Sequence, residues 1–492
     1  ARRENQLRPD LRQHAHGSRH LQEARTRRVQ PHLSCPAAAR RAAHRRSGEH
    51  RSRDGLRPIR PRRAHHADEG ILHAPLPRAR RGDPPPTLRR VPLGRRRRRP
   101  PLPIRHQDRD RRGLLITVHR PLPMNLPILR LGQTYESCDR VELDLGGGRV
   151  ATTHTANPGL IRRDLLRISE AKAALDAIPA DTLAGYCEEA AELFLHAELP
   201  CGETTQGPDD YIESLSALTR LPHSLVRMNM TKVHAAMSQV RTVIGGLTRG
   251  MPLEIFDAGL TRLDELSVNY YPTTTSLGVS LPSNAPAVNS LWIPAPVMKI
   301  PVLLKPGRED PFTPLRIVQA MIAAGFPKQA FGYYPTTHEG GDTIVTCCGR
   351  GISFGSDATV RKYSAYPGVQ VHGTGRSKIL IGDDMVDRWE EFLPVLVESI
   401  SANGGRSCIN TSAILVPRHR DEIADALAAE LAKITPLPRD HECALLCGFA
   451  NAALADGIDD LITAQLKEAG AEDFTARHRD GPRKIEAFDQ IY

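Results

Sequence analysis

The sequence lacks features that define several classes of protein. It has no run of about 18 apolar residues, so no segment is predicted to span a membrane. Its first residues are positively charged but no apolar stretch follows them, so no secretory signal peptide is predicted. The nine cysteines are scattered and do not form the paired spacing of a zinc site. A cytoplasmic protein with reduced thiols and no metal site is the expectation.

Residues 1–123 lack lysine, phenylalanine, tyrosine, tryptophan and methionine altogether. They contain 33 arginines against 10 acidic residues, a net charge of +23, whereas the whole chain carries +11 and the remainder therefore −12. A segment of this composition cannot bury enough apolar surface to offset the entropy lost on folding. It is predicted to be a disordered, basic N-terminal segment.

Two interpretations of this basic segment differ in what they imply for function. As a basic arm it would bind nucleic acid or another acidic surface, which makes nucleic-acid binding the non-enzyme alternative. Its composition is also typical of GC-rich DNA translated outside its reading frame or upstream of the true start. Met124, the first methionine, opens "MNLPILRLGQ", where the composition becomes ordinary. We favour the second interpretation, so nucleic acid is not an expected partner.

From residue 124 onwards the hydrophobic pattern predicts helices first and then alternating strands and helices. Helices are predicted over 181–197, most of 213–250, 313–327 (capped by Thr313), from 355 to 363, 420–434 and 456–470. Strands are predicted over 266–282, 299–305, 343–347, 352–354, 378–382 and 483–492. Cys443 and Cys447 are expected on one face of a helix. The alternation beyond Pro282 favours a doubly wound α/β sheet.

Two short motifs follow predicted strands and carry polar side chains. "LPSNAP" (281–286) contains Asn284, whose amide can donate to an oxyanion, although an asparagine in such a loop often only satisfies the backbone. "LLKPGRED" (303–310) places Lys305 at the carboxyl end of a strand, where open α/β sheets bind ligands. An ordinary solvated lysine is the alternative for that position.

Two further motifs follow later in the chain. "SFGSDATV" (353–360) puts Gly355 and Ser356 between a strand and a helix, where backbone amides favour a phosphate, although Ser356 also suits a plain helix cap. "NGGRSCINTS" (403–412) sets Cys408 behind two glycines, which permit a tight backbone with amides directed at an oxyanion. Taken alone, such a cysteine is more often structural than catalytic.

The four motifs occur in the order found in the aldehyde dehydrogenase superfamily, which the chain resembles over roughly 180–492. That family runs Pro-x-Asn, Lys-Pro, Phe-Thr-Gly-Ser, Glu-Leu-Gly-Gly-Lys and Gly-Gln-x-Cys, and "AAGFP" (323–327) matches its Ala-Gly-x-Pro. The resemblance implies an α/β fold with a Rossmann-type cofactor domain. Residues 124–370 would form a helical lead-in and the NAD(P)-binding domain, and residues 371–492 the catalytic domain.

The resemblance also implies a role for each motif residue. Cys408 would be the nucleophile that forms a thiohemiacetal or a thioester, and Asn284 with the Cys408 backbone amide would stabilise the oxyanion. The cofactor would be NADP or NAD, which supplies the hydride chemistry. Lys305 would bind the adenosine ribose, and Gly355 and Ser356 would lie under the pyrophosphate. Arg308, close to the place where NAD-preferring members carry a glutamate, would accept a 2′-phosphate.

One departure from the family pattern bears on the reaction. Aligning "HGTGRS" (372–377) with Glu-Leu-Gly-Gly-Lys-Ser puts His372 where hydrolytic members have the glutamate that activates water. Without it, a thiol such as coenzyme A can accept the acyl group, as in the acyl-CoA reductase branch that includes the fatty acyl reductases of bacterial luminescence. An acyl-CoA or aldehyde substrate is therefore expected, with a hydrolytic aldehyde dehydrogenase as the alternative. His372 is either a general acid/base or a structural loop histidine.

The resemblance sets two further expectations for the chain as a whole. Members of the family continue beyond the second helix after the cysteine with a Glu-x-Phe-Gly-Pro segment, which is not found before Tyr492. A C-terminally incomplete catalytic domain, inactive as a fragment, is therefore an expectation. The strand-like segment 266–282 would be half of an intersubunit arm, so the full-length protein is expected to be a homo-oligomer.

Overall fold

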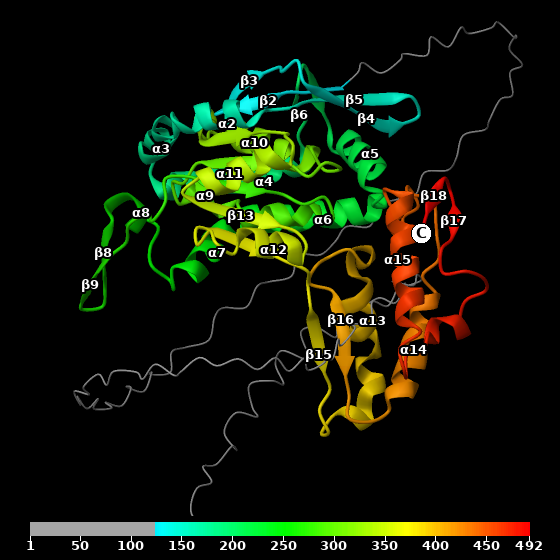
Figure 1. Cartoon of the computed structure of the whole chain (residues 1–492). Coiled ribbons are helices and arrows are strands. Elements are labelled where there is room, and N and C mark those ends of the chain that lie inside the picture. Colours follow the sequence, from blue (N-terminus) through cyan, green and yellow to red (C-terminus); the bar gives the residue numbers. More distant parts are fainter. Residues whose placement is uncertain (1–123) are drawn as a thin grey trace, which may run out of the picture. The chain divides into compact units, whose positions relative to one another are not determined.

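A computed structural model describes residues 124–492, all of which belong to one compact unit (Figure 1). The predicted disorder and the basic arm of residues 1–123 lie outside the described residues. Between Met124 and Tyr492, no helix is both long and apolar enough to cross a membrane.

A seven-stranded sheet forms the centre of this unit. Its strands lie in the order β14 (Val369–His372), β13 (Arg350–Phe354), β10 (Leu277–Ser280), β11 (Val302–Lys305), β12 (Phe331–Tyr333), β2 (Ile128–Arg130) and β3 (Gln133–Tyr135). The five strands from β14 to β12 are parallel, and β2 and β3 pair antiparallel at one end. From β10 the chain moves outward to β11 and β12, then returns to the other side of β10 as β13 and β14. This is the order of a Rossmann-type sheet, with its topological switch point between β10 and β13.

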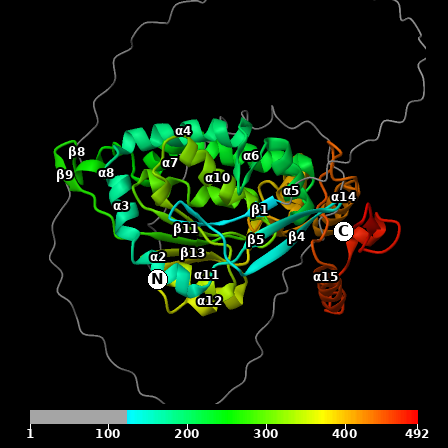
Figure 2. The same cartoon turned by 90° about the horizontal axis from the view of Figure 1, so that it is seen from above.

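Helices cover both faces of the parallel strands, which explains why those strands are continuous apolar runs. Figure 2 shows α4 (Ala180–His196), α6 (His223–Ser238) and α10 (Phe312–Ala323) on one side, and α2 (Pro158–Leu165), α11 (His338–Cys347) and α12 (Asp357–Tyr363) on the other. Val302, Leu303 and Leu304 of β11 have no solvent exposure as a result. The predicted doubly wound α/β sheet is confirmed.

Two local predictions in this part of the chain were wrong. The segment 343–347 is not a strand but the last turns of α11, because its buried side chains Ile344 and Val345 pack as one helix face against the sheet. Thr313 does not cap α10. The carboxylate of Asp310 accepts the Thr313 backbone N–H at 3.0 Å, so the cap comes from a buried aspartate that precedes the helix.

A lead-in region precedes the parallel strands and packs against them. Its elements, and those that connect the sheet strands, are β1 (Met124–Leu126), β4 (Arg140–Gly146), β5 (Arg149–His154), α3 (Ile168–Asp176), β6 (Leu199–Cys201), β7 (Thr204–Gln206), α5 (Pro208–Thr219), α7 (Val240–Leu247), α8 (Ile255–Ala258), β8 (Leu260–Leu263), β9 (Leu266–Asn269), η1 (Pro286–Leu291), α9 (Pro294–Val297) and η2 (Lys328–Ala330). The helices predicted over 181–197 and 213–250 are confirmed as α4 to α7. The single strand predicted over 266–282 is two strands, since β9 pairs with β8 in a hairpin and only β10 joins the sheet.

The last part of the described chain forms smaller elements. These are β15 (Ser377–Leu380), η3 (Val386–Phe392), α13 (Leu393–Ser401), η4 (Ala402–Gly405), β16 (Thr411–Leu415), α14 (Arg420–Ala432), α15 (Ala452–Gln465), η5 (Phe474–Arg477), β17 (Glu486–Ala487) and β18 (Gln490–Ile491). β15 and β16 pair in parallel, and α13 and α14 pack on them through a small core that includes Ile381, Leu396 and Ile423. The predicted single strand 483–492 is a short hairpin.

Cys443 and Cys447 do not share a helix. The chain between Asp440 and Asn451 contains no helix or strand, and its backbone bonds include a local turn from Ala444 N to His441 O. Arg439 O accepts from His223 N, and Phe449 N donates to Ile491 O. The two cysteines therefore differ in environment: Cys443 is exposed and Cys447 is buried.

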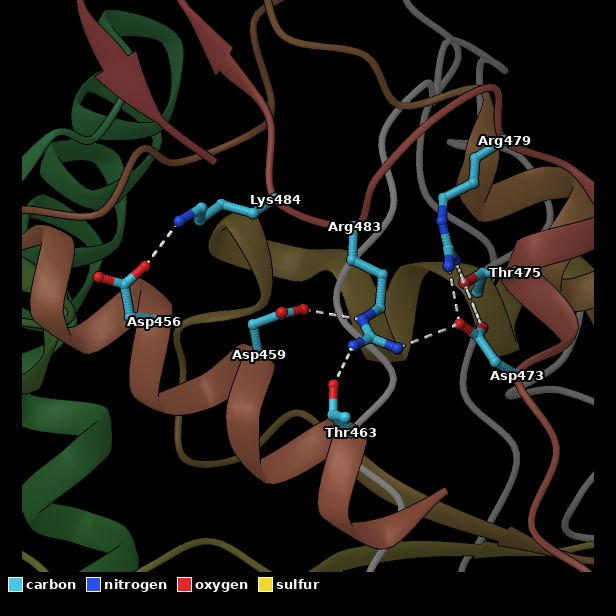
Figure 3. A network of polar contacts seen from close by, with 8 residues as sticks. All are labelled: Asp456, Asp459, Thr463, Asp473, Thr475, Arg479, Arg483 and Lys484. Carbon is cyan, nitrogen blue, oxygen red and sulfur yellow. Dashed lines mark hydrogen bonds and ion pairs between the residues drawn. The ribbon is translucent and has the colours of Figure 1, made fainter. Parts of the chain in front are cut away.

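An ion-pair network joins α15 to the segment that follows it (Figure 3). Arg483 bonds to Asp459 at 2.8 Å and to Thr463 at 2.6 Å, both on α15, and lies 3.8 Å from Asp473. Asp473 also accepts from Arg479 at 2.8 Å. The residues that follow α15 are therefore attached to it through charged and polar side chains.

Candidate active site

Cys408 follows a turn of unusual backbone conformation. Asn403, Gly404 and Gly405 all have left-handed backbone angles, with φ of 54°, 62° and 72°. Three such residues in succession reverse the chain between α13 and β16, and Cys408 emerges beyond them with an exposed side chain. The Asn-Gly-Gly sequence suits this turn because glycine adopts positive φ without strain and asparagine tolerates it.

Gly404 is required by its surroundings as well as by its φ. A Cβ placed on Gly404 would collide with the Sγ atom of Cys447, which lies directly beneath the turn. Burial raises the pKa of the Cys447 thiol to about 11, so this thiol stays protonated and unreactive. The two cysteines in this region thus divide into a buried packing residue and an exposed residue, Cys408, that is open to a substrate.

The loop between β14 and β15 lies against the segment that contains Cys408, the candidate nucleophile. A Cβ on Gly375 would overlap the backbone carbonyl of Cys408, so the two backbones are in direct contact and only glycine fits. This loop is part of "HGTGRS" (372–377), the stretch aligned with the family's glutamate motif. The structure therefore brings that stretch and Cys408 together, although they are far apart in the sequence.

Asn284 lies beside the turn that carries Cys408. Its Nδ2 atom donates to the backbone carbonyl of Arg406 at 2.7 Å. The loop that contains Asn284 follows β10, and Leu281 N donates to Lys305 O at 2.8 Å, which ties this loop to the end of the next strand. An amide side chain and the candidate nucleophile are thus placed at the carboxyl edge of the parallel sheet, where ligands bind in such folds.

His372 is the last residue of β14. Its ring stacks on the ring of Phe354, with centroids 4.9 Å apart and planes 17° apart. Its backbone carbonyl accepts the Gly355 N–H at 3.1 Å. No hydrogen bond joins the imidazole to any other group of residues 124–492, so its two nitrogen atoms are available to a ligand.

Lys305 ends β11 and lies half-buried at the same edge of the sheet. Burial lowers its pKa, while the nearby carboxylate of Glu309 acts in the opposite direction. Its aliphatic stem passes Gly341 of α11, with Cδ 3.5 Å from the position of a Cβ there. The ammonium group has no hydrogen bond or ion pair within the described part of the chain. A partly desolvated, unpaired cation of this kind suits a phosphate or a ribose hydroxyl.

The other cofactor residues predicted from sequence lie on the same edge of the sheet or in the loops that follow it. Gly355 and Ser356 join β13 to α12, at the switch point, and the Ser356 hydroxyl makes no capping bond to that helix. The Gly355 N–H is already bonded to His372 O. The hydroxyl of Ser356 is therefore the polar group of this pair that can bind a phosphate. Arg308 is exposed in the loop after Lys305. Among residues 124–492 no cluster of side chains suited to a metal ion is found.

Sequence reasoning missed two buried asparagines that connect the parts of this site. Asn229 on α6 donates to the Asn403 side chain at 2.7 Å, and Asn403 donates to the Asn284 backbone carbonyl at 3.3 Å. Asn403 is visible in the sequence as a turn signal, whereas nothing in the sequence around Asn229 distinguishes it from any polar residue on a helix.

Comparison with known proteins identifies the family. The model of the aldehyde dehydrogenase family matches residues 224–485, which is more than half of the chain and includes every candidate site residue named above.

The chain belongs to the aldehyde dehydrogenase family.

Solved structures that this chain resembles include several aldehyde dehydrogenases. Aldehyde dehydrogenase C from Pseudomonas syringae, crystallised as a mutant with NAD+ and octanal, has a TM-score of 0.61 at 18% identity, over 74% of this chain and 73% of its own. A putative aldehyde dehydrogenase from Burkholderia cenocepacia has a TM-score of 0.56 at 18% identity, over 72% and 74%. An NADP-dependent enzyme from E. coli has a TM-score of 0.58 at 14% identity, over 70% and 71%. No curated protein matches the chain by sequence.

The family and the fold are thereby established, and the chain is an oxidoreductase of the aldehyde dehydrogenase superfamily. At these identities the solved structures establish the fold alone. None of the structures named here carries the name of an acyl-CoA reductase, and they do not determine which reaction this chain catalyses.

Proposed function

We propose that this aldehyde dehydrogenase family member reduces an acyl-CoA to an aldehyde through an acyl group carried on Cys408. The observation that carries the proposal is the composition of the loop that contacts Cys408. Residues 372–376 are His, Gly, Thr, Gly and Arg, and the backbone of Gly375 touches that of Cys408. In this loop His372 stands at the position aligned with the family's water-activating glutamate, and without that carboxylate a thiol can accept the acyl group.

An NAD(P) cofactor fits the residues at the carboxyl edge of the sheet. Lys305 offers an unpaired, half-buried ammonium group, and Ser356 offers a hydroxyl and a backbone N–H at the switch point between β10 and β13. These residues would hold the ribose and the phosphates, and the exposed Arg308 would reach a 2′-phosphate. When bound, the cofactor supplies the hydride. Related structures with NAD+ and an NADP-dependent relative support either form.

The protein's own residues carry out the acyl transfer. The Cys408 thiolate attacks the thioester carbonyl, a carbon–sulfur bond to the enzyme forms, the bond to the coenzyme sulfur breaks, and the coenzyme thiolate leaves. The Asn284 amide has two N–H bonds. One donates to Arg406 O at 2.7 Å and fixes the orientation of the amide, which leaves the second N–H for the oxyanion. The Cys408 backbone N–H supplies the second donor.

His372 would move the proton. Its ring is held by the stack on Phe354 and both nitrogen atoms are free of partners within the described residues, so it can protonate the leaving thiolate or take the proton of the Cys408 thiol.

The test is covalent labelling with a radiolabelled acyl-CoA in the absence of cofactor. The protein should become labelled, and Cys408→Ala should abolish the label. Cys443→Ala removes another exposed cysteine and should leave the label unchanged. Protein that takes up no label, or label that survives Cys408→Ala, contradicts the proposal.

A hydrolytic aldehyde dehydrogenase is the second candidate. It is favoured by the solved relatives, one of which was crystallised with octanal. Product analysis separates the two. Free acid formed from an aldehyde and NAD(P) without added thiol supports the hydrolytic reaction, whereas aldehyde formed from acyl-CoA and reduced cofactor supports the first.

We further propose that the protein assembles as a homo-oligomer through the β8–β9 hairpin. An isolated two-stranded hairpin is marginally stable, yet this one exposes Leu260, Leu263 and Leu266 by 55%, 46% and 70%. A partner surface would cover these side chains. Mass measurement by light scattering should give a multiple of the chain mass, and Leu263→Asp with Leu266→Asp should reduce it to the monomer.

A further inference from the structure

We infer that Asn229, a residue of the helical lead-in, positions the nucleophile turn against the oxyanion loop. The inference rests on the proposed function, in which Cys408 accepts an acyl group beside Asn284. Asn229 touches neither a substrate nor the reacting atoms, so it is a positioning residue and not a catalytic one.

Asn229 lies on α6, is 1% exposed and uses its whole side-chain amide. Its Nδ2 donates to Leu225 O of its own helix at 2.8 Å and to Asn403 Oδ1 at 2.7 Å. Its Oδ1 accepts the Ala287 backbone N–H at 3.2 Å. A single side chain therefore holds both the turn before Cys408 and the start of η1, which directly follows the loop that contains Asn284.

The two segments that Asn229 holds are also bonded to each other. Asn403 Nδ2 donates to Asn284 O at 3.3 Å, and Asn284 Nδ2 donates to Arg406 O at 2.7 Å. Three segments are thus joined in pairs: α6 to the loop, α6 to the turn, and the loop to the turn. Asn403 bonds to the backbone of Asn284, and the Asn284 amide bonds to the backbone of Arg406 in the same turn, so the placement of the Asn284 amide depends on the turn that Asn229 holds.

The turn itself makes this support necessary. Asn403 and Gly404 are left-handed residues with no regular hydrogen-bond ladder, so their placement depends on side-chain contacts. Asn403 is 2% exposed, and its own carbonyl accepts the Arg406 N–H at 3.2 Å. A shift of this turn by a fraction of an ångström would move the Cys408 sulfur relative to the amide that stabilises the oxyanion. Displacements of about 1 Å cost about 100-fold in rate.

The most informative variant is Asn229→Asp. It has the same shape and keeps an acceptor for the Ala287 N–H, but it places an oxygen opposite Asn403 Oδ1. An ionised carboxylate there also loses the bond to Leu225 O, and Asn403 relieves the repulsion by turning its amide over, which removes its Nδ2 from Asn284 O. The substitution therefore disturbs the alignment of the two segments without opening a cavity.

Two reactions of the Cys408 thiol distinguish positioning from general structural support. Acylation by p-nitrophenyl butyrate passes through an oxyanion: the thiolate forms a carbon–sulfur bond, the ester carbon–oxygen bond breaks, and nitrophenolate is released. Alkylation by iodoacetamide needs no oxyanion, and mass spectrometry measures it at Cys408 alone. Asn229→Asp should slow the nitrophenolate burst by roughly 10- to 100-fold and change the alkylation rate by less than about threefold.

A second variant guards against loss of folding. Asn403→Gly keeps the left-handed backbone, since glycine adopts a φ of 54° freely. It removes the Asn403 amide, which bonds to both Asn229 and Asn284. This variant should slow acylation as much as Asn229→Asp does. The double variant should be no slower than either single variant, because all three lose the bond between positions 229 and 403. Effects that multiply in the double variant would overturn the inference.

Asn289→Leu is the matched control. Asn289 is also buried, at 3% exposure, and bonds to Pro286 O at 2.9 Å and to the Trp292 ring N–H at 2.9 Å, with no bond to the nucleophile turn. It should lower the thermal stability while keeping the ratio of acylation to alkylation. A nitrophenolate burst that persists in Cys408→Ala contradicts both the proposed function and the inference. A normal Cys408-dependent burst in Asn229→Asp, or one lowered in parallel with alkylation, overturns the inference alone.

Discussion

In the parallel sheet, β11 has three consecutive side chains with no solvent exposure, whereas every side chain of β16, the strand after Cys408, is at least partly exposed. The cofactor edge of the sheet belongs to one large apolar core, and the region after residue 377 has only small apolar clusters. The second region compensates with polar contacts, such as the asparagines around residue 403 and the ion pairs of Figure 3.

This difference separates two ways of placing a functional residue. Lys305 is placed by the strand that carries it, because apolar burial fixes the strand as a whole. Cys408 is placed by a few specific contacts, namely the asparagine hydrogen bonds of the preceding turn and the close approach of Gly375. Substitutions in the first region should therefore act mainly on ligand binding, and those in the second on the geometry of the reaction.

The largest loss of activity is expected at Gly375, whose backbone contacts that of Cys408. Gly375→Ala would force a Cβ into the Cys408 carbonyl, so one of the two backbones must move. We expect Cys408-dependent acylation to fall by about 100-fold or more, measured as the nitrophenolate burst. Gly368→Ala is the control, since a Cβ there meets its nearest atom, Gly349 O, at an ordinary 3.5 Å. Equal activity in both variants would show that the loop does not position Cys408.

An intermediate effect is expected at Lys305. Burial lowers its pKa, so the ammonium group loses its proton at a lower pH than an ordinary lysine, for which the value is 10.5. A neutral amine binds a cofactor less strongly, so affinity should fall as the pH rises toward this lowered pKa. Lys305→Met should weaken cofactor binding by about 10-fold, corresponding to about 1.4 kcal/mol, and remove the pH dependence.

Cofactor titration by calorimetry between pH 7 and pH 10 measures this effect. Lys232→Met removes an exposed lysine of α6 and should change nothing. If the cofactor affinity of Lys305→Met still depended on pH, the titrating group would be one other than Lys305.

The smallest effect is expected in the ion-pair network of the C-terminal region. Burial acts to raise the pKa of Asp473, but the hydrogen bonds from Arg479 and Thr475 outweigh it and the pKa falls to about 2. Because the folded-state pKa is depressed, the stabilisation is complete above the ordinary value of 3.8 and is lost as the pH falls through about 2. Asp473→Asn should lower the free energy of unfolding by about 1 kcal/mol at pH 7.

Urea unfolding at several pH values checks this prediction. The difference between Asp473→Asn and the unchanged protein should narrow as the pH falls from 5 toward 2. Asp383→Asn breaks a pair with Arg418 in which the aspartate is 84% exposed, and it should have almost no effect. A difference that is constant with pH would mean that the charge of Asp473 is not the cause.

The same contrast explains what could be predicted from the sequence. The strands of the sheet appear as apolar runs, and the order of the motifs places Asn284, Lys305 and Ser356 along one edge. The prediction of a strand over 343–347 was wrong. Its β-branched residues favour a strand in isolation, whereas packing on the sheet favours a helix. The incomplete catalytic domain and the 370/371 domain boundary stay predictions.

In the region of Cys408 the sequence is less informative for a physical reason. The contacts of Asn229 with Asn403 and of Gly375 with Cys408 join residues far apart in the chain. No local periodicity records such a pair, so neither could be found from one sequence. The roles assigned to Cys408 and His372 remain predictions that rest on the order of motifs and on the placement described here.

The turn before Cys408 also has a chemical consequence. Asparagine followed by glycine is a thermolabile pair, because the next backbone nitrogen can attack the side-chain carbonyl and release ammonia. Asn403 and Gly404 are such a pair, and loss of the side-chain nitrogen would remove the donor that bonds to Asn284 O. In the folded protein both ends of the Asn403 side chain are bonded and 98% of the residue is shielded from water. The contacts that hold the turn before Cys408 therefore also shield Asn403 from deamidation, and unfolding would expose the Asn403–Gly404 pair to it.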